Sequence, residues 1–438
     1  MRIGIIGGTK GLGKTLAWYF KEDNFDVTIT GRDTSVGDKV SEELGVNYSN
    51  DNIETVKNSD IVIISVPISS TEGVIKELAK YMPKDSLMID VTSVKEGPSY
   101  CMNDCLKENT NGGVEFIPTH PVFGPRTTSL DGQVIVLTPI SKGKWYPKVY
   151  KYLSDKKMRI IETSPKHHDN MMGIVQVLTH FSYISTASAI EKLKINIKDT
   201  EDYESPIYNL MIDTIARIVS QNPYLTYSIQ HENKSGEKIR QAFAESVNEL
   251  KEVLTAEDED KFVDIAITAT KHMGDIQNAL GRSDKAINSL TQEFNTLRNS
   301  VGEEIGLEHI YSGKVHIGVL EEINTDSLKI KSSKMTKSLK IANVRILSKE
   351  EILKWKIANQ KIYNQSISCV FPNTSDSEII KNTLSNVEEI TDVKITDIYN
   401  GPQIKENHSS YTFEVSGLSN KAIENCKTLI QGFGGLIR

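Results

Sequence analysis

Short apolar runs alternate with helical repeats of apolar residues through the first third of the chain. Residues 2–6 form such a run, and after a glycine-rich turn Leu16, Ala17 and Phe20 recur at the spacing of one helix face. Strands separated by helices predict an α/β domain over residues 1–163, with a mostly parallel, doubly wound sheet and ligands beyond the carboxyl ends of its strands. The expected strands are residues 2–6, 26–30, 60–66, 86–91, 114–118, 133–137 and 159–162, and the expected helices after the first are residues 70–81 and 100–108.

The alternation ends at Ser164-Pro165, and the pattern up to about residue 300 predicts helices alone. One of them begins at Ser205-Pro206, where serine suits the N-cap and proline suits the first turn. Such helices carry more apolar surface than one subunit can cover, so we expect residues 164–300 to form a helical domain for substrate binding and homodimer formation. The expected helices are residues 168–193, 205–219, 224–231, 236–254 and 257–280.

The last third of the chain predicts two smaller parts that are rich in strands. Residues 301–365 are expected to form a small β-rich insertion, and residues 366–438 predict the order β-α-β-β-α-β of a ferredoxin-like α+β module. The insertion has expected strands at residues 314–319, 328–332 and 342–347. The module has expected strands at residues 366–371, 393–399, 410–415 and 436–438, and expected helices at residues 377–385 and 420–431.

Composition and charge narrow the class of protein. The 438 residues carry a formal net charge of −7 and a pI of about 5.8, which argues against bulk attraction to nucleic acid. No apolar run reaches the roughly 18 residues of a membrane span, and the N-terminus enters a strand without room for a signal peptide. The four cysteines suggest no disulfide framework and no metal site. We therefore expect a cytoplasmic protein that binds no nucleic acid, membrane or metal ion.

A glycine-rich turn joins the first expected strand to the first helix. Glycines let the backbone approach a pyrophosphate, and the N-terminus of the following helix supplies N–H donors and a positive dipole end. This is the pattern of a Rossmann-like nucleotide-binding domain, although Lys10 stands where the strict fingerprint requires a second glycine. A tight turn without a ligand is the alternative. The residues expected at the cofactor are Gly7, Gly8, Thr9, Lys10, Gly11, Leu12 and Gly13.

The end of the second expected strand bears on the choice of cofactor. An acidic residue at this position usually binds the ribose hydroxyls of NAD, whereas a nearby arginine can pair with the 2′-phosphate of NADP. Gly31 occupies the acidic position and Arg32 follows it, which favours NADP through guanidinium–phosphate pairing. Asp33 keeps NAD as the alternative, and Arg32 could also be a plain surface charge.

A histidine stands next to the end of the expected strand 114–118. His120 belongs to the run Thr119–Pro125, whose prolines and glycine predict a rigid loop after the strand. An imidazole is the side chain best suited to moving a proton near neutral pH, with an ordinary pKa of about 6.5. Ser93 also follows an expected strand, so we expect both side chains to face the nicotinamide. Ser93 could hydrogen-bond the imidazole or the substrate, or cap the next helix together with Glu96.

Three polar side chains stand out on otherwise apolar helices. Gln176 and His180 lie four residues apart and share a face, so a substrate or a partner in the core must satisfy them. Arg217 is flanked by apolar residues, and an unpaired buried charge is costly. Its expected partner is either Asp213, one helical turn earlier, or a substrate carboxylate. His168, with the histidine before it, is expected only to cap its helix.

Several motifs together resemble those of the prephenate dehydrogenase family of tyrosine biosynthesis. They occur in the family's order over roughly residues 1–285, and their combination is far more specific than the glycine turn alone. The motifs are the glycine turn, Asp90–Pro98, His120–Pro125, His168-Asp169 followed by Gln176-x-Leu178-x-His180-Phe181, and Ser205–Tyr208 leading to Ala216-Arg217.

The resemblance implies NAD(P)-dependent oxidative decarboxylation of prephenate to 4-hydroxyphenylpyruvate. It implies that His120 takes the proton of the ring hydroxyl, that Ser93 orients this exchange and that Arg217 holds a carboxylate of prephenate. Gln176 and His180 would line the pocket. Arogenate, which carries an amine in place of the keto group, is the rival substrate, and a non-catalytic NADP-binding scaffold or sensor is the remaining alternative.

Some features depart from the family pattern or go beyond it. Lys10 replaces a fingerprint glycine, and Asn209 stands where some relatives carry a second arginine. The glycine turn also resembles that of NADP-dependent deazaflavin oxidoreductases, which favours NADP. The module at residues 366–438 has the element order of regulatory ACT domains, but Pro372–Ser375 replaces their glycine-rich turn. Tyrosine as an effector therefore stands beside a role of this module in oligomerisation or stability.

Overall fold

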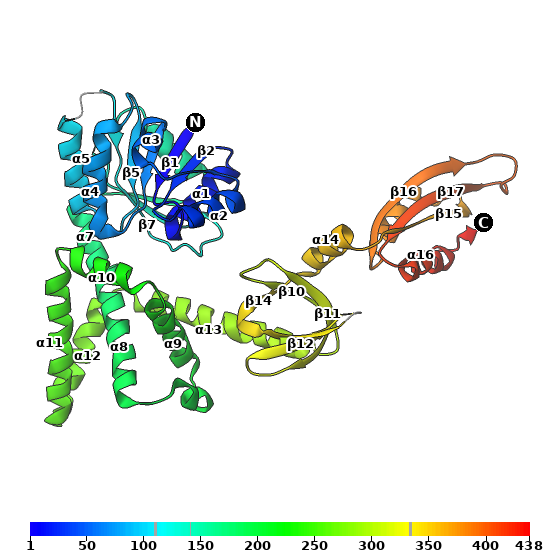
Figure 1. Ribbon diagram of the computed structural model, residues 1–438. Helices are drawn as coiled ribbons and strands as arrows, with labels where there is room; N and C mark the ends of the chain where they lie inside the picture. Colours follow the sequence, from blue (N-terminus) through cyan, green and yellow to red (C-terminus); the bar gives the residue numbers. More distant parts are fainter. Residues whose placement is uncertain (109–111, 141, 333–334) are drawn as a thin grey trace. The chain divides into compact units, whose positions relative to one another are not determined.

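The computed structural model describes residues 1–108, 112–140, 142–332 and 335–438 of the chain (Figure 1). The chain divides into two units, Met1–Ile276 and Gln277–Arg438. No helix formed by the described residues is long and apolar enough to span a lipid bilayer.

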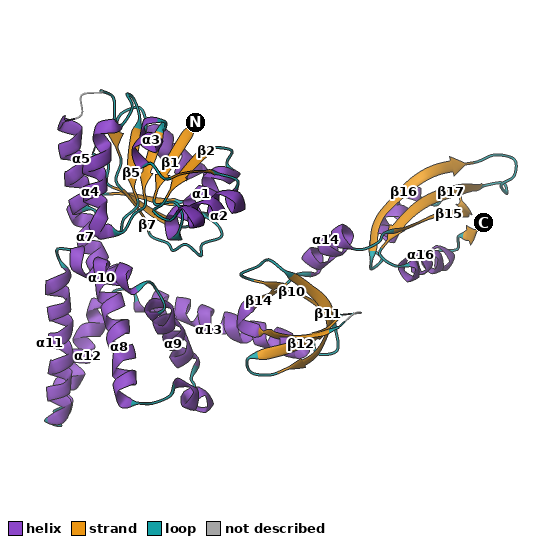
Figure 2. Cartoon of the chain, viewed as in Figure 1, coloured by secondary structure: helices purple, strands orange, loops and turns teal. Residues whose placement is uncertain are grey.

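A parallel sheet forms the centre of the N-terminal α/β part of the first unit (Figure 2), and its six strands have the order β3-β2-β1-β4-β5-β6. This arrangement confirms the predicted doubly wound α/β fold. The strand order changes direction between β1 and β4, and ligands of such folds bind beyond the strand ends at this point. The strands are β1 (Arg2–Ile6), β2 (Asp26–Thr30), β3 (Asn47–Ser49), β4 (Ile61–Ile64), β5 (Leu87–Asp90) and β6 (Glu115–Phe116). The helices that connect them are α1 (Gly11–Glu22), α2 (Thr34–Leu44), α3 (Asn52–Lys57), α4 (Ile68–Leu78) with the short η1 (Ala79–Tyr81), and α5 (Glu96–Glu108).

Apolar side chains on both faces of this sheet form two cores. Ile3 and Ile5 of β1 belong to one core, and Ile6 belongs to the other, which also includes residues of α4 and α5. All three isoleucines are at most 1% exposed. Burial on both faces explains why β1 and β4 are continuous apolar runs in the sequence rather than alternating ones.

His120 lies in a second, smaller sheet rather than in the loop that the sequence predicted. It forms part of β7 and pairs with Val136 of the antiparallel β8, while β9 is parallel to β8. A proline disfavours helical backbone in the residue before it, so Pro121 favours an extended His120, and pairing with β8 completes the strand. These elements are β7 (Thr119–Pro121), β8 (Val134–Leu137), α6 (Tyr146–Asp155) and β9 (Arg159–Glu162).

The described residues from 165 to 276 form helices and their connections, as the sequence predicted. Ser164 and Ser205 cap α7 and α9 through their hydroxyl groups. The elements are α7 (Pro165–Met172), the π-helical η2 (Gly173–Leu178), α8 (Thr179–Leu193), the 3-10 helix η3 (Ile197–Tyr203), α9 (Pro206–Val219), α10 (Pro223–Glu232), α11 (Gly236–Thr255), α12 (Glu259–His272) and α13 (Ile276–Asn299).

Two of the predicted helices are interrupted. The helix expected over residues 168–193 contains η2, where Gly173 approaches α11 so closely that a Cβ on it would lie 2.5 Å from Cδ1 of Ile239. The helix expected over residues 257–280 is two helices, α12 and α13. Gly274 between them has φ of +76°, in the left-handed region where helices commonly end.

Two antiparallel sheets belong to the second unit. One has the order β13-β12-β11-β10-β14, and the sequence predicted only three of these strands; β13 is a mostly polar edge strand without an apolar signal. The other has the order β16-β17-β15-β18 and confirms the predicted ferredoxin-like module. The elements of the first part are β10 (Glu304–His309), β11 (Val315–Ile323), β12 (Ser327–Lys331), β13 (Thr336–Lys340), η4 (Ile341–Asn343), β14 (Val344–Ile346) and α14 (Lys349–Asn359). Those of the module are β15 (Tyr363–Pro372), α15 (Ser377–Ser385), β16 (Ile390–Tyr399), β17 (His408–Gly417), α16 (Asn420–Gly432) and β18 (Leu436–Ile437).

Candidate active site

The imidazole of His120 lies in a buried polar site between β7 and the first helices of the helical segment. The residue is only 2% exposed. Its Nδ1 is 2.8 Å from Nε2 of His168 in α7, and its Nε2 is 3.4 Å from the amide nitrogen of Gln176 in η2. The structure therefore brings two of the predicted site residues, His120 and Gln176, into contact.

His168 has a different position from the one that the sequence predicted. Ser164, and not His168, caps α7, through a 3.2 Å hydrogen bond from the backbone N–H of His167. His168 instead lies in the interior, where its Nδ1 is 2.7 Å from the Asp169 carboxylate while its Nε2 faces His120. The prediction missed this contact because the two histidines are far apart in the sequence.

Asp169 also caps the helix that follows Ser93. Its two carboxylate oxygens accept hydrogen bonds from the backbone N–H groups of Lys95, at 2.8 Å, and Glu96, at 3.0 Å. The alternative that Ser93 caps this helix is therefore wrong, because Asp169 binds the donors that such a cap would use. Ser93 is half-buried, and its hydroxyl makes no hydrogen bond with His120 or with any other described residue.

A buried ion pair connects the end of β5 to β7. The side chains of Lys95 and Asp90 are both 0% exposed and form a short salt bridge. The Lys95 ammonium also donates to the backbone carbonyl of Thr119, at 2.6 Å, next to His120. Thr92 donates to the same Asp90 oxygen through its hydroxyl, at 2.5 Å. Burial lowers the pKa of Lys95, while the negative charge of Asp90 opposes this shift.

The surroundings of His120 favour its neutral form. Burial lowers the pKa of His120 well below its ordinary value, and the nearby His168 and Lys95 lower it further. Burial also lowers the pKa of His180, which lies in α8. A neutral imidazole has one nitrogen with a free lone pair, so His120 can accept a proton.

Several buried polar atoms near this site have no partner within the described part of the chain. They include Oε1 of Gln176 and Nδ1 of His180, one helical turn further along. Leaving a buried polar group unpaired costs roughly 1–3 kcal/mol, so such atoms suggest that a ligand supplies the missing hydrogen bonds.

Arg217 is exposed on α9, whereas the sequence predicted a buried charge. It forms no ion pair with Asp213 or with another carboxylate among the described residues. It lines a pocket of about 270 Å³ together with the segment that follows His120. The other lining residues are Gly124, Arg126, Thr127, Thr128, Ser129 and Gln133.

This segment after His120 also contacts α1, the helix that follows the glycine turn. The hydroxyl of Thr15 donates to the carbonyl of Pro125, and the hydroxyl of Tyr19 donates to the carbonyl of Thr127, each at 3.1 Å. The pocket with Arg217 therefore lies close to the start of the nucleotide-binding helix.

The glycine turn has the geometry that a dinucleotide requires. Gly7 has φ of +86°, and a Cβ on it would lie 2.3 Å from the carbonyl oxygen of Ser65. A Cβ on Gly13 would lie 2.6 Å from the carbonyl oxygen of Gly7, so these glycines allow the turn and the helix to approach each other. Gly8 and Thr9 complete the turn, and Gly11, Leu12 and Gly13 form the first residues of α1.

The N-terminus of α1 has no side-chain cap. Lys10 occupies the N-cap position and is exposed, and its side chain makes no capping hydrogen bond, whereas Asp33 and Asp51 cap the neighbouring α2 and α3. Uncapped N–H groups at a helix N-terminus bind anions such as phosphate. The glycine cradle and this open helix end together fit the pyrophosphate of a dinucleotide.

Comparison with known proteins decides the family. The family model described as the nucleotide-binding domain of prephenate dehydrogenase matches residues 16–162, and the one described as its dimerization domain matches residues 164–267. The chain belongs to the prephenate dehydrogenase family. It is similar to a probable arogenate/prephenate dehydrogenase of Methanocaldococcus jannaschii, with 39% identity over 99% of this chain and 98% of the relative.

Further relatives cover about two thirds of this chain. A T-protein of Haemophilus influenzae is 27% identical over 68% of this chain and 73% of its own length. The crystal structure of prephenate dehydrogenase from A. aeolicus in complex with hydroxyphenyl propionate and NAD+ has a TM-score of 0.50 at 21% identity, and covers 63% of this chain and 98% of that one. This structural likeness shows a shared fold. The chain is thus an oxidoreductase of the prephenate/arogenate dehydrogenase family, with an NAD-binding domain.

In this family member the end of β2 leaves no room for an acidic side chain. A Cβ on Gly31 would lie 2.6 Å from the side chain of Thr9. Asp33 accepts a hydrogen bond from the backbone N–H of Val36, at 3.2 Å, and so serves as the N-cap of α2. Arg32 between them is exposed.

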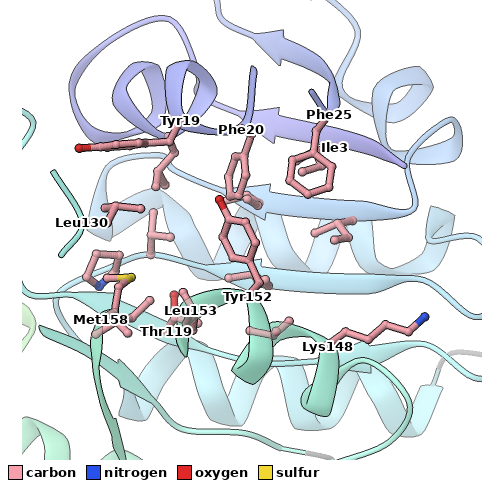
Figure 3. A pocket seen from close by; sticks show the side chains of 18 of the residues that line it. Ile3, Tyr19, Phe20, Phe25, Thr119, Leu130, Lys148, Tyr152, Leu153 and Met158 are labelled. Atoms are coloured by element: carbon pink, nitrogen blue, oxygen red, sulfur yellow. The ribbon is translucent and has the colours of Figure 1, made fainter. Parts of the chain in front are cut away.

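A separate apolar cavity of about 170 Å³ lies between the six-stranded sheet and α6 (Figure 3). Ile3, Phe20 and Tyr152 line it, and nearly all of its other side chains are apolar. Prephenate and arogenate both carry two carboxylates, and an apolar lining cannot supply the hydrogen bonds or the positive charges that buried carboxylates need. The cavity is therefore space within the core of the nucleotide-binding domain rather than the substrate site.

Proposed function

We propose that this member of the prephenate dehydrogenase family catalyses the NAD(P)-dependent oxidative decarboxylation of prephenate to 4-hydroxyphenylpyruvate. The observation that carries the proposal is the buried ring of His120, whose Nε2 faces Gln176 at 3.4 Å. Polar atoms of Gln176 and His180 lack partners among the described residues, so a bound substrate would satisfy them.

In the proposed reaction His120 accepts at Nε2 the proton of the hydroxyl group on ring carbon 4. The hydrogen on the same carbon leaves as a hydride, which the nicotinamide takes up when bound. Loss of the carboxylate on carbon 1 as CO2 returns its bonding electron pair to the ring, which becomes aromatic. His120 then gives its proton to the phenolate oxygen. The protein therefore positions the substrate and holds one proton during the transfer.

Ser93 and Arg217 have binding roles in this proposal. The half-buried hydroxyl of Ser93 has no partner among the described residues, so it is available to orient the ring hydroxyl of the substrate. The exposed guanidinium of Arg217 faces a pocket next to the segment that follows His120, where it would bind a carboxylate of prephenate.

The same pocket supports prephenate over arogenate. Its described lining contains two arginines, three hydroxyl-bearing residues and one glutamine, and no lining residue carries a carboxylate. The ammonium group of arogenate prefers an anionic partner, while a second guanidinium nearby repels it. The keto acid meets no such repulsion.

The end of β2 supports NADP over NAD. Gly31 has no side chain with which to bind the ribose hydroxyls, and the carboxylate of Asp33 caps α2. The exposed Arg32 lies next to this position and can pair with a 2′-phosphate.

The proposal includes a homodimer formed by the helical segment. Its helices expose many large apolar side chains, as expected of a surface that a second subunit covers. These side chains include Ile184, Leu193, Ile207, Met211, Leu254, Phe262, Val263 and Ile267. Light scattering of the purified protein should give twice the chain mass of 48.9 kDa, and a monomer at micromolar concentration would contradict this part of the proposal.

A steady-state assay that crosses prephenate and arogenate with NADP and NAD tests the function. We expect the highest kcat/KM for prephenate with NADP, and release of one CO2 for each reduced cofactor. Preference for arogenate would overturn the substrate assignment alone. Turnover of neither substrate with either cofactor would overturn the proposed function.

A further inference from the structure

Three buried side chains near the substrate site form a continuous chain of hydrogen bonds. Asp169 contacts Nδ1 of His168 at 2.7 Å, and Nε2 of His168 contacts Nδ1 of His120 at 2.8 Å. Each residue is at most 3% exposed, so water does not compete for these contacts. This series of hydrogen bonds reaches His120 at Nδ1, whereas Gln176 contacts Nε2 of the same ring.

The direction of these hydrogen bonds follows from what Asp169 can do. An ionised carboxylate only accepts, and this one already accepts the backbone N–H groups of Lys95 and Glu96. His168 must therefore donate to it from Nδ1. When His168 is neutral, it therefore accepts at Nε2, so His120 donates from its own Nδ1.

The remaining nitrogen of His120 then carries a free lone pair. This nitrogen, Nε2, is the one that faces Gln176, whose amide oxygen lacks a partner among the described residues. The amide nitrogen of Gln176 is a donor and lies 3.4 Å from it, which agrees with an acceptor at this position. The opposite tautomer would place two donors against each other.

We propose that His168 and Asp169 are positioning residues that hold His120 in the tautomer with its acceptor nitrogen toward the substrate. The inference rests on the proposed function of His120 as the proton acceptor. It assigns to these two neighbours on α7 the part that an orienting carboxylate plays for a histidine base in other enzymes. When His120 takes up the proton, the negative charge of Asp169 stabilises the imidazolium through His168.

Further contacts hold the Asp169 end of this series of hydrogen bonds. The amide of Asn233 donates to the backbone carbonyl of Asp169 at 2.8 Å, and the Asp169 carboxylate holds the start of α5. Lys95, which pairs with Asp90, is the other charged group that acts on His120. Asp169 thus has a structural contact as well, and the test must separate the two roles.

Two substitutions of His168 separate positioning from packing. In His168→Gln the amide oxygen can accept from His120 while the amide nitrogen donates to Asp169. In His168→Leu the volume is similarly filled, but His120 loses its acceptor. Both variants leave the Asp169 carboxylate free to cap α5. His167→Asn is the matched control, because His167 is the exposed neighbour on the same helix.

We expect His168→Gln to keep kcat within about tenfold of the unmodified protein, and His168→Leu to lose on the order of a hundredfold. Cofactor affinity, measured by fluorescence titration, and Tm should stay the same in both variants and in the control. Equal kcat values for the glutamine and leucine variants, in folded proteins, would overturn the proposal because packing alone would then explain the residue.

Nitrogen-15 NMR of the histidine-labelled intact protein gives a second test that needs no substrate. We expect His120 to carry its proton on Nδ1 and to have an unprotonated Nε2, with assignment of its signals from the His120→Asn protein. A proton on Nε2 of neutral His120 would overturn the proposal. If instead the tautomer is as expected but prephenate is not oxidised, the proposed function fails and the positioning contact stands.

Discussion

Replacing Lys95 with methionine tests the buried ion pair between β5 and β7. The side chains of Lys95 and Asp90 are both 0% exposed, and Oδ1 of Asp90 already lacks a partner among the described residues. Lys95→Met leaves this carboxylate buried without its counter-ion and removes the donor to the Thr119 carbonyl. Breaking such a buried pair costs about 3–5 kcal/mol of unfolding free energy, and the hydrogen bonds from Thr92 should keep the loss near the lower end.

Urea denaturation followed by tryptophan fluorescence measures this loss. Trp355→Phe in the background leaves Trp18 and Trp145, which both belong to the first unit, as the reporters. Lys151→Met is the control, because the Lys151–Asp155 pair is 75% and 61% exposed and should contribute less than about 1 kcal/mol. A loss for Lys95→Met as small as that of the control would refute the reasoning.

Five further outcomes can be measured. His120→Asn should leave a folded, cofactor-binding protein whose kcat falls by roughly 10²–10⁴-fold, and near-normal turnover would remove its role as base. Arg217→Gln should raise KM for prephenate by about 10–150-fold, equivalent to roughly 1.5–3 kcal/mol for a charged hydrogen bond, and an unchanged KM would contradict carboxylate binding. Burial, His168 and Lys95 lower the pKa of His120, so the residue stays neutral at pH 6.5. We therefore expect kcat/KM to be independent of pH near pH 6.5 and to fall only at lower pH. A midpoint of this fall above pH 6.5 would contradict a neutral His120 as the base. The free energy of unfolding that depends on neutral His120 is fully present above about pH 6.5 and is lost as the pH falls below this value. Below pH 6.5 the free energy of unfolding of His120→Asn should therefore fall less steeply with pH than that of the unmodified protein. Titration calorimetry of the intact protein with tyrosine should give saturable heat if the module at residues 366–438 binds an effector, and no heat would leave that module a role in oligomerisation or stability.

Local sequence signals predicted much of the fold. The bounds of β1 and β2 agree with the predicted strands, because a short run with apolar residues between turns marks a buried strand without further information. The order of the ferredoxin-like module also follows from local patterns. The short β3 and the polar edge strand β13 were missed, because their pairing with a neighbour, and not their own apolar pattern, makes them strands.

The sequence likewise predicted some residues of the candidate site but not the contacts between them. Motifs and helix faces identified His120, Gln176 and Arg217, since each stands out within its own segment. The environment of His120 was not predictable, because His168 and Lys95 reach it from other segments, and only packing brings them together. The sequence did contain a signal, namely charged residues at strand and helix ends in an apolar context, but it did not show which of them pair.

One carboxylate shows why that packing matters for function. Asp169 accepts hydrogen bonds from His168 and from two backbone N–H groups at the start of α5. Three donors on three different groups fix its orientation, and His168 and His120 take their orientation from it in turn. Because Asp169 and His168 lie on α7 whereas His120 lies on β7, the proposed base exists in its acceptor form only where the helical segment packs on the nucleotide-binding domain. On this proposal the helical segment both lines the substrate site and sets the tautomer of the residue that would take the proton.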